Sequence, residues 1–292
     1  MLHGLLFEAL TARDSAAALR ELDERGLLTT LIPELEAGRG FTQPSLHFYD
    51  VLDHNLAAVA AIDTILGDGE DNREVRAALE WVDFDAALGG QVDGVPLRTL
   101  IRLASVLHDV AKPHTATMGD GRLRFPRHGP HGGELMRERL PQLGLGEEAT
   151  DLVARLIRYH LRPGELIKNG AATDRAVRRF VTDLDGHVLP LMLVSMADGM
   201  ATRGPGYTRE HFRRHCAFVN YVAARAWAVS DEGEAPLLTG DDLIGELDLS
   251  GGRLLGAVLT SVRRAQYERA ITTRHDALAL ARSVLETLKA AD

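Results

Sequence analysis

The sequence has a single cysteine, Cys216, among its 292 residues. One thiol cannot form an intramolecular disulfide, and a chain without disulfides is typical of the reducing cytoplasm. Zinc sites built from several cysteine thiolates are excluded as well. Any metal ion would therefore be bound by histidine and carboxylate side chains.

Long apolar runs are also missing. No stretch approaches the roughly 18 consecutive apolar residues that a membrane span needs. The first residues, MLHGLLFEALTARDS, lack the basic region and the small-residue cleavage site of a signal peptide. We therefore expect a cytoplasmic protein that does not enter a membrane.

Positive charge is in the minority. Lys and Arg together number 33 against 42 Asp and Glu, which gives a formal net charge of −9. That balance is not typical of a protein that coats nucleic acid. A polyanionic substrate would have to be bound by a local basic patch or by metal ions.

Apolar residues recur at helical intervals along almost the whole chain. Between residues 51 and 66 they include Leu52, Leu56, Val59 and Ile62, which share one face of a helix. Similar patterns predict helices near residues 71–88, 97–112, 131–141, 147–161, 173–183, 187–201, 207–229, 251–268 and 273–290. A turn signal at Gly119-Asp120-Gly121 predicts one small β-hairpin at about 115–125. The predicted fold is therefore all-α, a helical bundle with this hairpin.

The stretch VSDEGEAPLLTG (229–240) is acidic and contains Gly and Pro, and it predicts a boundary. We expect an N-terminal helical segment at 1–46 that packs on a main domain at 47–228. Residues 229–292 are expected to form a C-terminal helical tail.

Ionisable side chains interrupt the apolar helices. The stretch ASVLHDVAKPHTAT (104–117) carries the adjacent pair His108-Asp109, and such groups cost free energy in an apolar environment unless they are paired. Four more ionisable residues lie in or beside other apolar segments: His54, His128, His160 and Asp198. A helical core accepts these groups if they converge on a divalent cation, and imidazole with carboxylate suits Mn, Fe, Co, Ni or Zn. Without a metal, the alternative is a solvated helix edge at which Asp109 caps a backbone group.

The ordered set His54, His108-Asp109, Lys112, His128, His160 and Asp198 resembles the HD superfamily of metal-dependent phosphohydrolases. Longer segments, among them DVLDHNL, LASVLHDVAKPHTAT, LRFPRHGPHGGEL and LVARLIRYHLRP, resemble successive segments of bacterial CCA-adding tRNA nucleotidyltransferases and poly(A)-polymerase-like relatives. The resemblance runs through nearly the whole chain and implies that an HD domain with flanking helices occupies 47–228. The nucleotidyltransferase head of those enzymes carries a Gly-Ser pair and an Asp-x-Asp pair on a β-sheet. Here the Asp-x-Asp triplets at 83–85 and 183–185 lie in helical or loop contexts with no Gly-Ser pair before them, so nucleotidyl transfer is not expected of this sequence.

The resemblance implies metal ligands in two sets. Asp109 would be the central or bridging ligand. The remaining ligands would be His54, His108 and Asp198 for one ion, and His128 and His160 for a second. Tyr159 stands where some relatives have another histidine, so the choice between one and two divalent ions stays open.

The resemblance also implies that Asp109 and Lys112 are catalytic. Lys112 projects from nearly the same helical face as Asp109 and would contact the scissile phosphate; the alternative is an ordinary lysine near a helix C-terminus. Arg162 is a second candidate for phosphate binding, with a structural role as the alternative. His131 either supports a ligand or faces the substrate, and His47 either lines the pocket or is structural.

The implied reaction is hydrolysis of a phosphoester by metal-activated water. The substrate would be a small nucleotide or an RNA 3′ end: a 2′,3′-cyclic phosphate, a 2′- or 3′-phosphate, or a cyclic nucleotide. The other hypothesis is a non-catalytic tRNA-binding partner of a separately encoded nucleotidyltransferase. We expect tRNA binding by this chain to be weak, because its net charge is −9 and basic and aromatic residues do not interleave. The sequence does not predict an oligomeric state.

Overall fold

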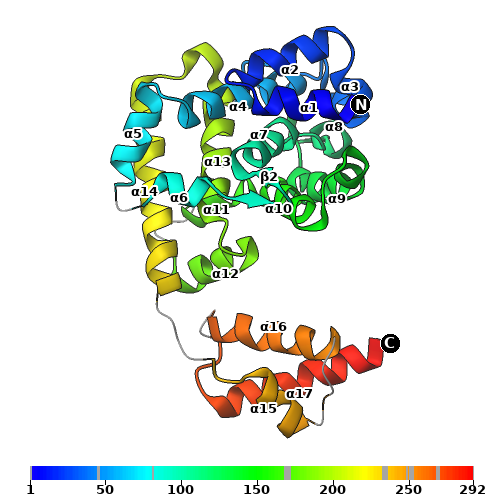
Figure 1. Cartoon of the computed structure of the whole chain (residues 1–292), viewed down its shortest axis with the longest axis vertical. Coiled ribbons are helices and arrows are strands. Elements are labelled where there is room, and N and C mark those ends of the chain that lie inside the picture. Colours follow the sequence, from blue (N-terminus) through cyan, green and yellow to red (C-terminus); the bar gives the residue numbers. More distant parts are fainter. Residues whose placement is uncertain are drawn as a thin grey trace. The chain divides into compact units, whose positions relative to one another are not determined.

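A computed structural model describes residues 2–44, 47–80, 82–167, 172–231, 236–247, 249, 253–267 and 270–291. The chain divides into unit 1, Met1–Glu165 with His187–Ala223, and unit 2, Leu166–Gly186 with Ala224–Asp292. Helices dominate both units, and the described strands form two short antiparallel hairpins (Figure 1). The all-α prediction with a small hairpin is confirmed. The predicted segment limits at residues 46 and 228 stay a prediction.

Unit 1 contains every residue that the sequence singles out for the site. Its α-helices are α1 (Leu2–Thr11), α2 (Ser15–Glu24), α3 (Leu28–Leu31), α4 (Val51–Leu66), α5 (Glu70–Ala78), α6 (Phe84–Leu88), α7 (Leu97–Leu107), α8 (Lys112–Thr115), α9 (His128–Arg139), α10 (Glu147–Tyr159) and α13 (Val188–Arg203). Two more, α11 (Arg162–Ile167) and α14 (Arg209–Asp231), continue into unit 2. Short 3₁₀ helices are η1 (Pro33–Gly38), η2 (Leu140–Leu143) and η3 (Gly204–Gly206).

Four helices make the core of unit 1. Helix α4 packs against α7 and α13, and α7 also packs against α10. Each contributes leucines that are at most 1% exposed, such as Leu56, Leu103, Leu156 and Leu193. Burying one such side chain stabilises the fold by roughly 1.5–3 kcal/mol. This packed frame fixes the backbone positions from which the ionisable residues project.

Glycines let α9 approach α10 closely. A Cβ at Gly133 would lie 2.7 Å from the carbonyl oxygen of Ala154, and one at Gly129 would lie 2.8 Å from that of Arg158. Neither distance is tolerated without a shift of backbone. The stretch HGPHGGE therefore matters for the site, because the same close approach sets His128 beside His160.

Replacement of Gly133 by alanine is expected to lower the free energy of unfolding by about 1 kcal/mol. Overpacking costs about 1–3 kcal/mol, which exceeds the gain of roughly 1 kcal/mol from removing a helical glycine. Denaturant unfolding measures the change. The matched control is Gly4→Ala in α1, where a new Cβ would meet nothing within 4 Å, so stability should rise by about 0.5–1 kcal/mol. Equal stabilisation by both variants would contradict the close approach.

Two expected helices are interrupted. The helix expected at 97–112 ends at Leu107, so His108 and Asp109 lie in the turn before α8. Pro113 contributes to the break, since it has no N–H for the carbonyl of Asp109, and it lies in the first turn of α8, where proline is tolerated. The helix expected at 71–88 is divided into α5 and α6, and Asp83 caps the second by accepting a hydrogen bond from the N–H of Ala86.

Both hairpins turn at an aspartate and a glycine. Strands β3 (Thr117–Gly119) and β4 (Arg122–Arg124) form the predicted hairpin, with Thr117 opposite Arg124. Strands β1 (Gln91–Val92) and β2 (Val95–Pro96) form a second one that was not predicted. Its Asp93-Gly94 turn has φ of 50° and 76°, the conformation that Asp-Gly favours.

Unit 2 has its own apolar core. It contains α12 (Asp174–Leu184), α15 (Gly240–Leu247), α16 (Arg253–Tyr267) and α17 (Arg274–Ala291). Helix α16 packs against α12, α15 and α17. The buried residues of this core are Leu238, Leu243, Leu249, Val258, Val262, Ala277, Ala281 and Leu285. Part of the predicted boundary, residues 232–235, lies outside the described residues.

No single helix in the described part of the chain is long and apolar enough to cross a membrane.

Candidate metal centre

Six ionisable residues from five parts of unit 1 meet at one place. Each comes from a helix or from the end of one: α4 carries His54, α13 carries Asp198, α9 starts at His128, and His108 and His160 cap the C-termini of α7 and α10. Asp109 lies in the turn after α7. Thus the structure brings together all six residues that the sequence predicts as ligands, and they form two groups of possible metal ligands.

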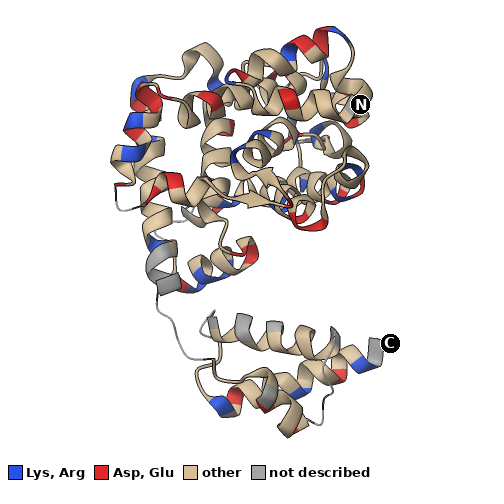
Figure 2. Cartoon of the chain, in the orientation of Figure 1, with Lys and Arg blue, Asp and Glu red and all other residues tan. Residues whose placement is uncertain are grey.

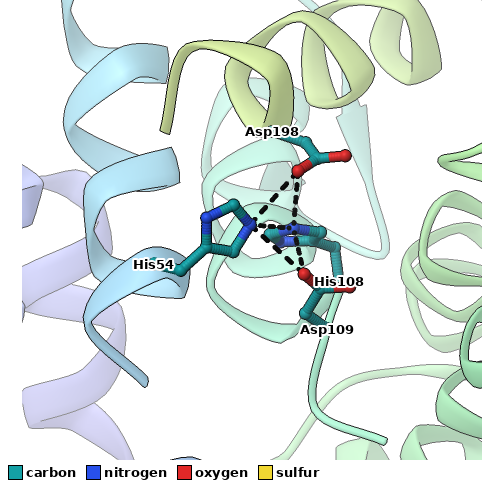
Figure 3. A group of neighbouring side chains, drawn as sticks. All are labelled: His54, His108, Asp109 and Asp198. Atoms are coloured by element: carbon teal, nitrogen blue, oxygen red, sulfur yellow. Dashed lines mark hydrogen bonds and ion pairs between the residues drawn. The ribbon is translucent and has the colours of Figure 1, made fainter. Parts of the chain in front are cut away.

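The first group consists of His54, His108, Asp109 and Asp198 (Figure 3). The Nε2 atom of His54 lies 3.1 Å from Nε2 of His108, 3.2 Å from Oδ2 of Asp109 and 3.1 Å from Oδ1 of Asp198. Oδ2 of Asp109 is also 3.2 Å from Nε2 of His108. Two imidazole nitrogens and two carboxylate oxygens therefore point at a common centre.

The second group consists of Asp109, His128 and His160. Here the other oxygen of Asp109 takes part: Oδ1 lies 3.2 Å from Nε2 of His128 and 3.6 Å from Nε2 of His160. The two Nε2 atoms are 3.2 Å apart. One carboxylate oxygen of Asp109 therefore faces the first group and the other faces the second group, which is the arrangement of a bridging ligand.

Backbone carbonyls fix which ring nitrogen faces the centre. The Nδ1 atoms of His108, His128 and His160 lie 2.7–2.8 Å from the carbonyl oxygen three residues earlier in the chain. A carbonyl only accepts hydrogen bonds, so each Nδ1 carries a proton and each Nε2 is left to face the centre. At such distances from one another and from carboxylates, the lone pairs of nitrogen and oxygen repel unless a proton or a metal cation lies between them. The donor set therefore fits a divalent metal.

The electrostatics of the centre favour positive charge. Burial alone would raise the pKa of Asp109, but Lys112 and His108 outweigh it and hold the pKa well below its usual range. Burial likewise opposes a charge on His108, yet the carboxylates of Asp109 and Asp198 raise its pKa to about 10. For His160, burial lowers the pKa, which keeps the ring neutral and able to bind a metal.

Lys112 lies against the first group. Its Nζ atom is 2.5 Å from Oδ2 of Asp109 and donates a hydrogen bond of 2.7 Å to Oε1 of Gln43. The amide of Gln43 is oriented by its own donation to the carbonyls of Tyr49 and Asp50. The sequence offers no local signal for Gln43, because its role depends on a contact between residues 69 positions apart.

His47 also reaches this centre. Its ring centroid is 5.6 Å from that of His54, and its Nε2 lies 3.4 Å from Nζ of Lys112. Burial and the Lys112 charge lower the pKa of His47 to about 4, so the ring is neutral. Of the two interpretations of His47, a position lining the pocket fits these contacts.

Arg162 and His131 are not members of the two groups. The guanidinium of Arg162 is 5.2 Å from the ring centroid of Tyr159. His131 is exposed, with its ring 6.5 Å from that of His114, and both line a surface pocket of about 340 Å³ with Pro33, Glu34, Ala37 and Leu135. The six predicted ligands are not in that lining. Substrate binding by Arg162 and His131 stays a prediction.

Comparison with known proteins agrees with this geometry. Residues 86–198 match the family described as HD domain. This segment is similar to HD domains. The matched segment holds five of the six residues and ends at Asp198, while His54 precedes it.

Relatives with known names cover more of the chain. It is 27% identical to the A-adding tRNA nucleotidyltransferase of Deinococcus radiodurans and 28% identical to the CC-adding tRNA nucleotidyltransferase of Thermus thermophilus. Each match covers 94% of this chain, and it covers 56% and 54% of those proteins. A bifunctional uridylyltransferase/uridylyl-removing enzyme of Rhodospirillum rubrum is 34% identical over 54% of this chain and 15% of its own length. The chain therefore spans about half the length of the tRNA enzymes, and the resemblance inferred from the sequence is confirmed.

Proposed function

We propose that this protein is a metal-dependent phosphohydrolase that acts on nucleotide or RNA-end phosphoesters. Candidate substrates are 2′,3′-cyclic phosphates, 2′- and 3′-phosphates and cyclic nucleotides. The observation that carries the proposal is the carboxylate of Asp109, which faces two groups of histidines with its two oxygens. HD domains form a superfamily of metal-dependent phosphohydrolases, so the matched family supports the same reaction class.

The protein's own residues have distinct tasks in this reaction. Asp109, Asp198 and four histidines would hold one or two divalent ions of Mn, Fe, Co, Ni or Zn. A bound divalent ion supplies an activated water and neutralises phosphate charge. The carbonyls behind His108, His128 and His160 keep each Nε2 directed at the centre. Lys112 would leave Asp109 to donate to a phosphate oxygen, with Gln43 keeping its ammonium close.

The names of three relatives support this choice of reaction and substrate. The Rhodospirillum rubrum relative is named a uridylyl-removing enzyme, and a uridylyl group is a nucleotide joined through its phosphate. The Deinococcus radiodurans and Thermus thermophilus relatives are named for tRNA, which favours an RNA end among the candidate substrates.

A substrate panel tests the proposal. Metal-stripped protein is reloaded with Mn, Fe, Co, Ni or Zn and assayed with bis-p-nitrophenyl phosphate, 2′,3′-cyclic AMP, 2′-AMP, 3′-AMP and 3′,5′-cyclic AMP. We expect hydrolysis of at least one nucleotide with at least one metal and none without metal. If every combination is inactive, the proposal is wrong.

Replacement of Lys112 by methionine is expected to lower kcat/KM by about a hundredfold at saturating metal. The substitution keeps the length of the side chain but removes the charge that would stabilise phosphate in the transition state. Saturating metal is needed because Lys112 also pairs with Asp109. The control is Lys289→Met on the exposed surface of α17. Unchanged kcat/KM would place phosphate binding elsewhere.

The alternative, a tRNA-binding partner of a separate nucleotidyltransferase, is favoured by the two tRNA enzymes that match 94% of the chain. Two features speak against this alternative. Acidic and basic side chains are interspersed on the described helices (Figure 2). In addition, Arg209 and Arg213 pair with carboxylates of α5, including Glu74. These pairs reduce the charge available to an RNA backbone. Tight binding of tRNA by protein that holds no metal and hydrolyses no substrate would favour this alternative.

A further inference from the structure

The two groups of predicted ligands open to solvent at Asp198. The side chains of His54, His108 and His160 are 0% exposed, that of Asp109 is 1% exposed and that of His128 is 7% exposed. The side chain of Asp198 is 19% exposed. Asp198 is therefore the most solvent-exposed of the six predicted ligands, and we call the residues around it the rim of the centre.

Phe48 is fixed on that rim. Its backbone N–H donates to the carbonyl of Thr202 at 3.0 Å, and Thr202 follows Asp198 by one helical turn in α13. The hydroxyl of Thr202 in turn lies 3.3 Å from Oδ1 of Asp198. On the other side, the residue before Phe48 is His47, which contacts Lys112. The backbone of Phe48 is therefore linked on one side to the helix that carries Asp198 and on the other to the residue that contacts the candidate phosphate-binding lysine.

The ring of Phe48 is both supported and exposed. It packs on the backbone of Gly204, where a Cβ would lie only 2.8 Å from the Cγ atom of Phe48. The ring of Tyr49 meets it edge-on, with centroids 4.9 Å apart and an interplanar angle of 85°. Yet Phe48 is 62% exposed, which leaves most of the ring in solvent. A large apolar side chain held in this way loses little entropy when a flat partner covers it.

We propose that Phe48 stacks on the nucleobase of the substrate while the phosphate lies at Asp109 and Lys112. A base is the flat, partly polar group that an exposed aromatic ring binds without hydrogen-bond readout. This inference rests on the proposed function and adds to it a residue that binds the base of the substrate.

Binding of two unreactive analogues to the Mn-loaded protein tests the inference. The probes are 3′-AMP and ribose 3-phosphate, each with the ester oxygen replaced by methylene so that neither is hydrolysed. Calorimetry is expected to show about tenfold tighter binding of the AMP analogue by the wild-type protein, since stacking on one aromatic ring contributes at this level. Phe48→Ala is expected to remove that preference and to leave the affinity for the ribose analogue unchanged.

Three further variants separate the effect of the aromatic ring from the effect of losing any exposed apolar side chain. Phe48→Leu keeps an apolar side chain on Gly204 but has no ring, so it should behave as the alanine variant does. Phe48→Trp should keep the preference, and the AMP analogue should quench its added fluorescence while the ribose analogue does not. Ile244→Ala removes an apolar side chain of unit 2 that is 42% exposed, and it should bind as the wild type does.

Equal affinity of the wild-type protein for the two analogues, or failure of the AMP analogue to bind, would overturn the stacking role. So would an equal loss of affinity for both analogues in Phe48→Ala. These outcomes are separate from failure of the proposed function, which would appear as the absence of metal binding and of hydrolysis across the substrate panel. Hydrolysis that does not depend on Phe48 would leave the phosphohydrolase standing without a base-stacking residue.

Discussion

Asp109→Asn is expected to lower kcat/KM by at least about a thousandfold and to abolish tight metal binding. The amide has the same shape as the carboxylate but no charge, and it offers one oxygen where Asp109 presents two to two groups of histidines. Loss of a bound metal removes both the activation of water and the neutralisation of phosphate, so their effects multiply. Asp109→Ala should be at least as severe.

The measurements for Asp109 separate chemistry from folding. Circular dichroism should show an unchanged helical spectrum, because the core of α4, α7, α10 and α13 is not altered. Metal content is measured by mass spectrometry after equilibrium dialysis, and turnover is measured with the best substrate of the panel. Asp120→Asn serves as the control, since Asp120 pairs with Arg124 on the exposed β3–β4 hairpin. Activity that survives in Asp109→Asn would place the chemistry elsewhere in the chain.

The second large effect concerns the number of ions. The wild-type protein is expected to bind two divalent ions, because its two groups of ligands use different oxygens of Asp109 and different histidines. His160→Ala should leave one ion, held by His54, His108, Asp109 and Asp198. His54→Ala should weaken the binding of that ion and leave the binding of the ion at Asp109, His128 and His160 unchanged. Loss of either ion is expected to lower turnover by at least about a hundredfold. The ligands determine how tightly each ion is held, and each bound ion helps to activate water and to neutralise the phosphate charge.

Titration of metal-stripped protein with Mn²⁺ gives the stoichiometry directly. Two equivalents are expected for the wild type, one for each single histidine variant and none for Asp109→Ala. His211→Ala is the histidine control, because His211 is bonded to Thr208 and lies outside both groups. An unchanged stoichiometry in His160→Ala would mean that the second group does not bind metal.

The sequence predicts the fold class and the six residues of the centre because each leaves a local signal. Helical spacing of apolar residues predicts the bundle, and a polar residue within such a segment, such as His108 or Asp109, is conspicuous. The structure adds how they meet, with Asp109 between two groups. That these residues bind metal stays a prediction, as do the roles of Arg162 and His131.

Other features of the site could not be predicted because they depend on distant contacts. Gln43 reaches Lys112 from a loop 69 residues earlier in the chain. Phe48 owes its place to a hydrogen bond with the carbonyl of Thr202. By contrast, the second hairpin was readable from Asp93-Gly94, since a tight turn follows from local backbone chemistry.

The most direct test of the central claim is anomalous diffraction from crystals of the Mn-loaded protein. We predict two anomalous peaks, one within the group of His54, His108, Asp109 and Asp198 and the other within the group of Asp109, His128 and His160. A single peak at either position would support a metal centre with one ion. No peak at Asp109, in crystals that bind Mn²⁺ elsewhere or not at all, would contradict the account.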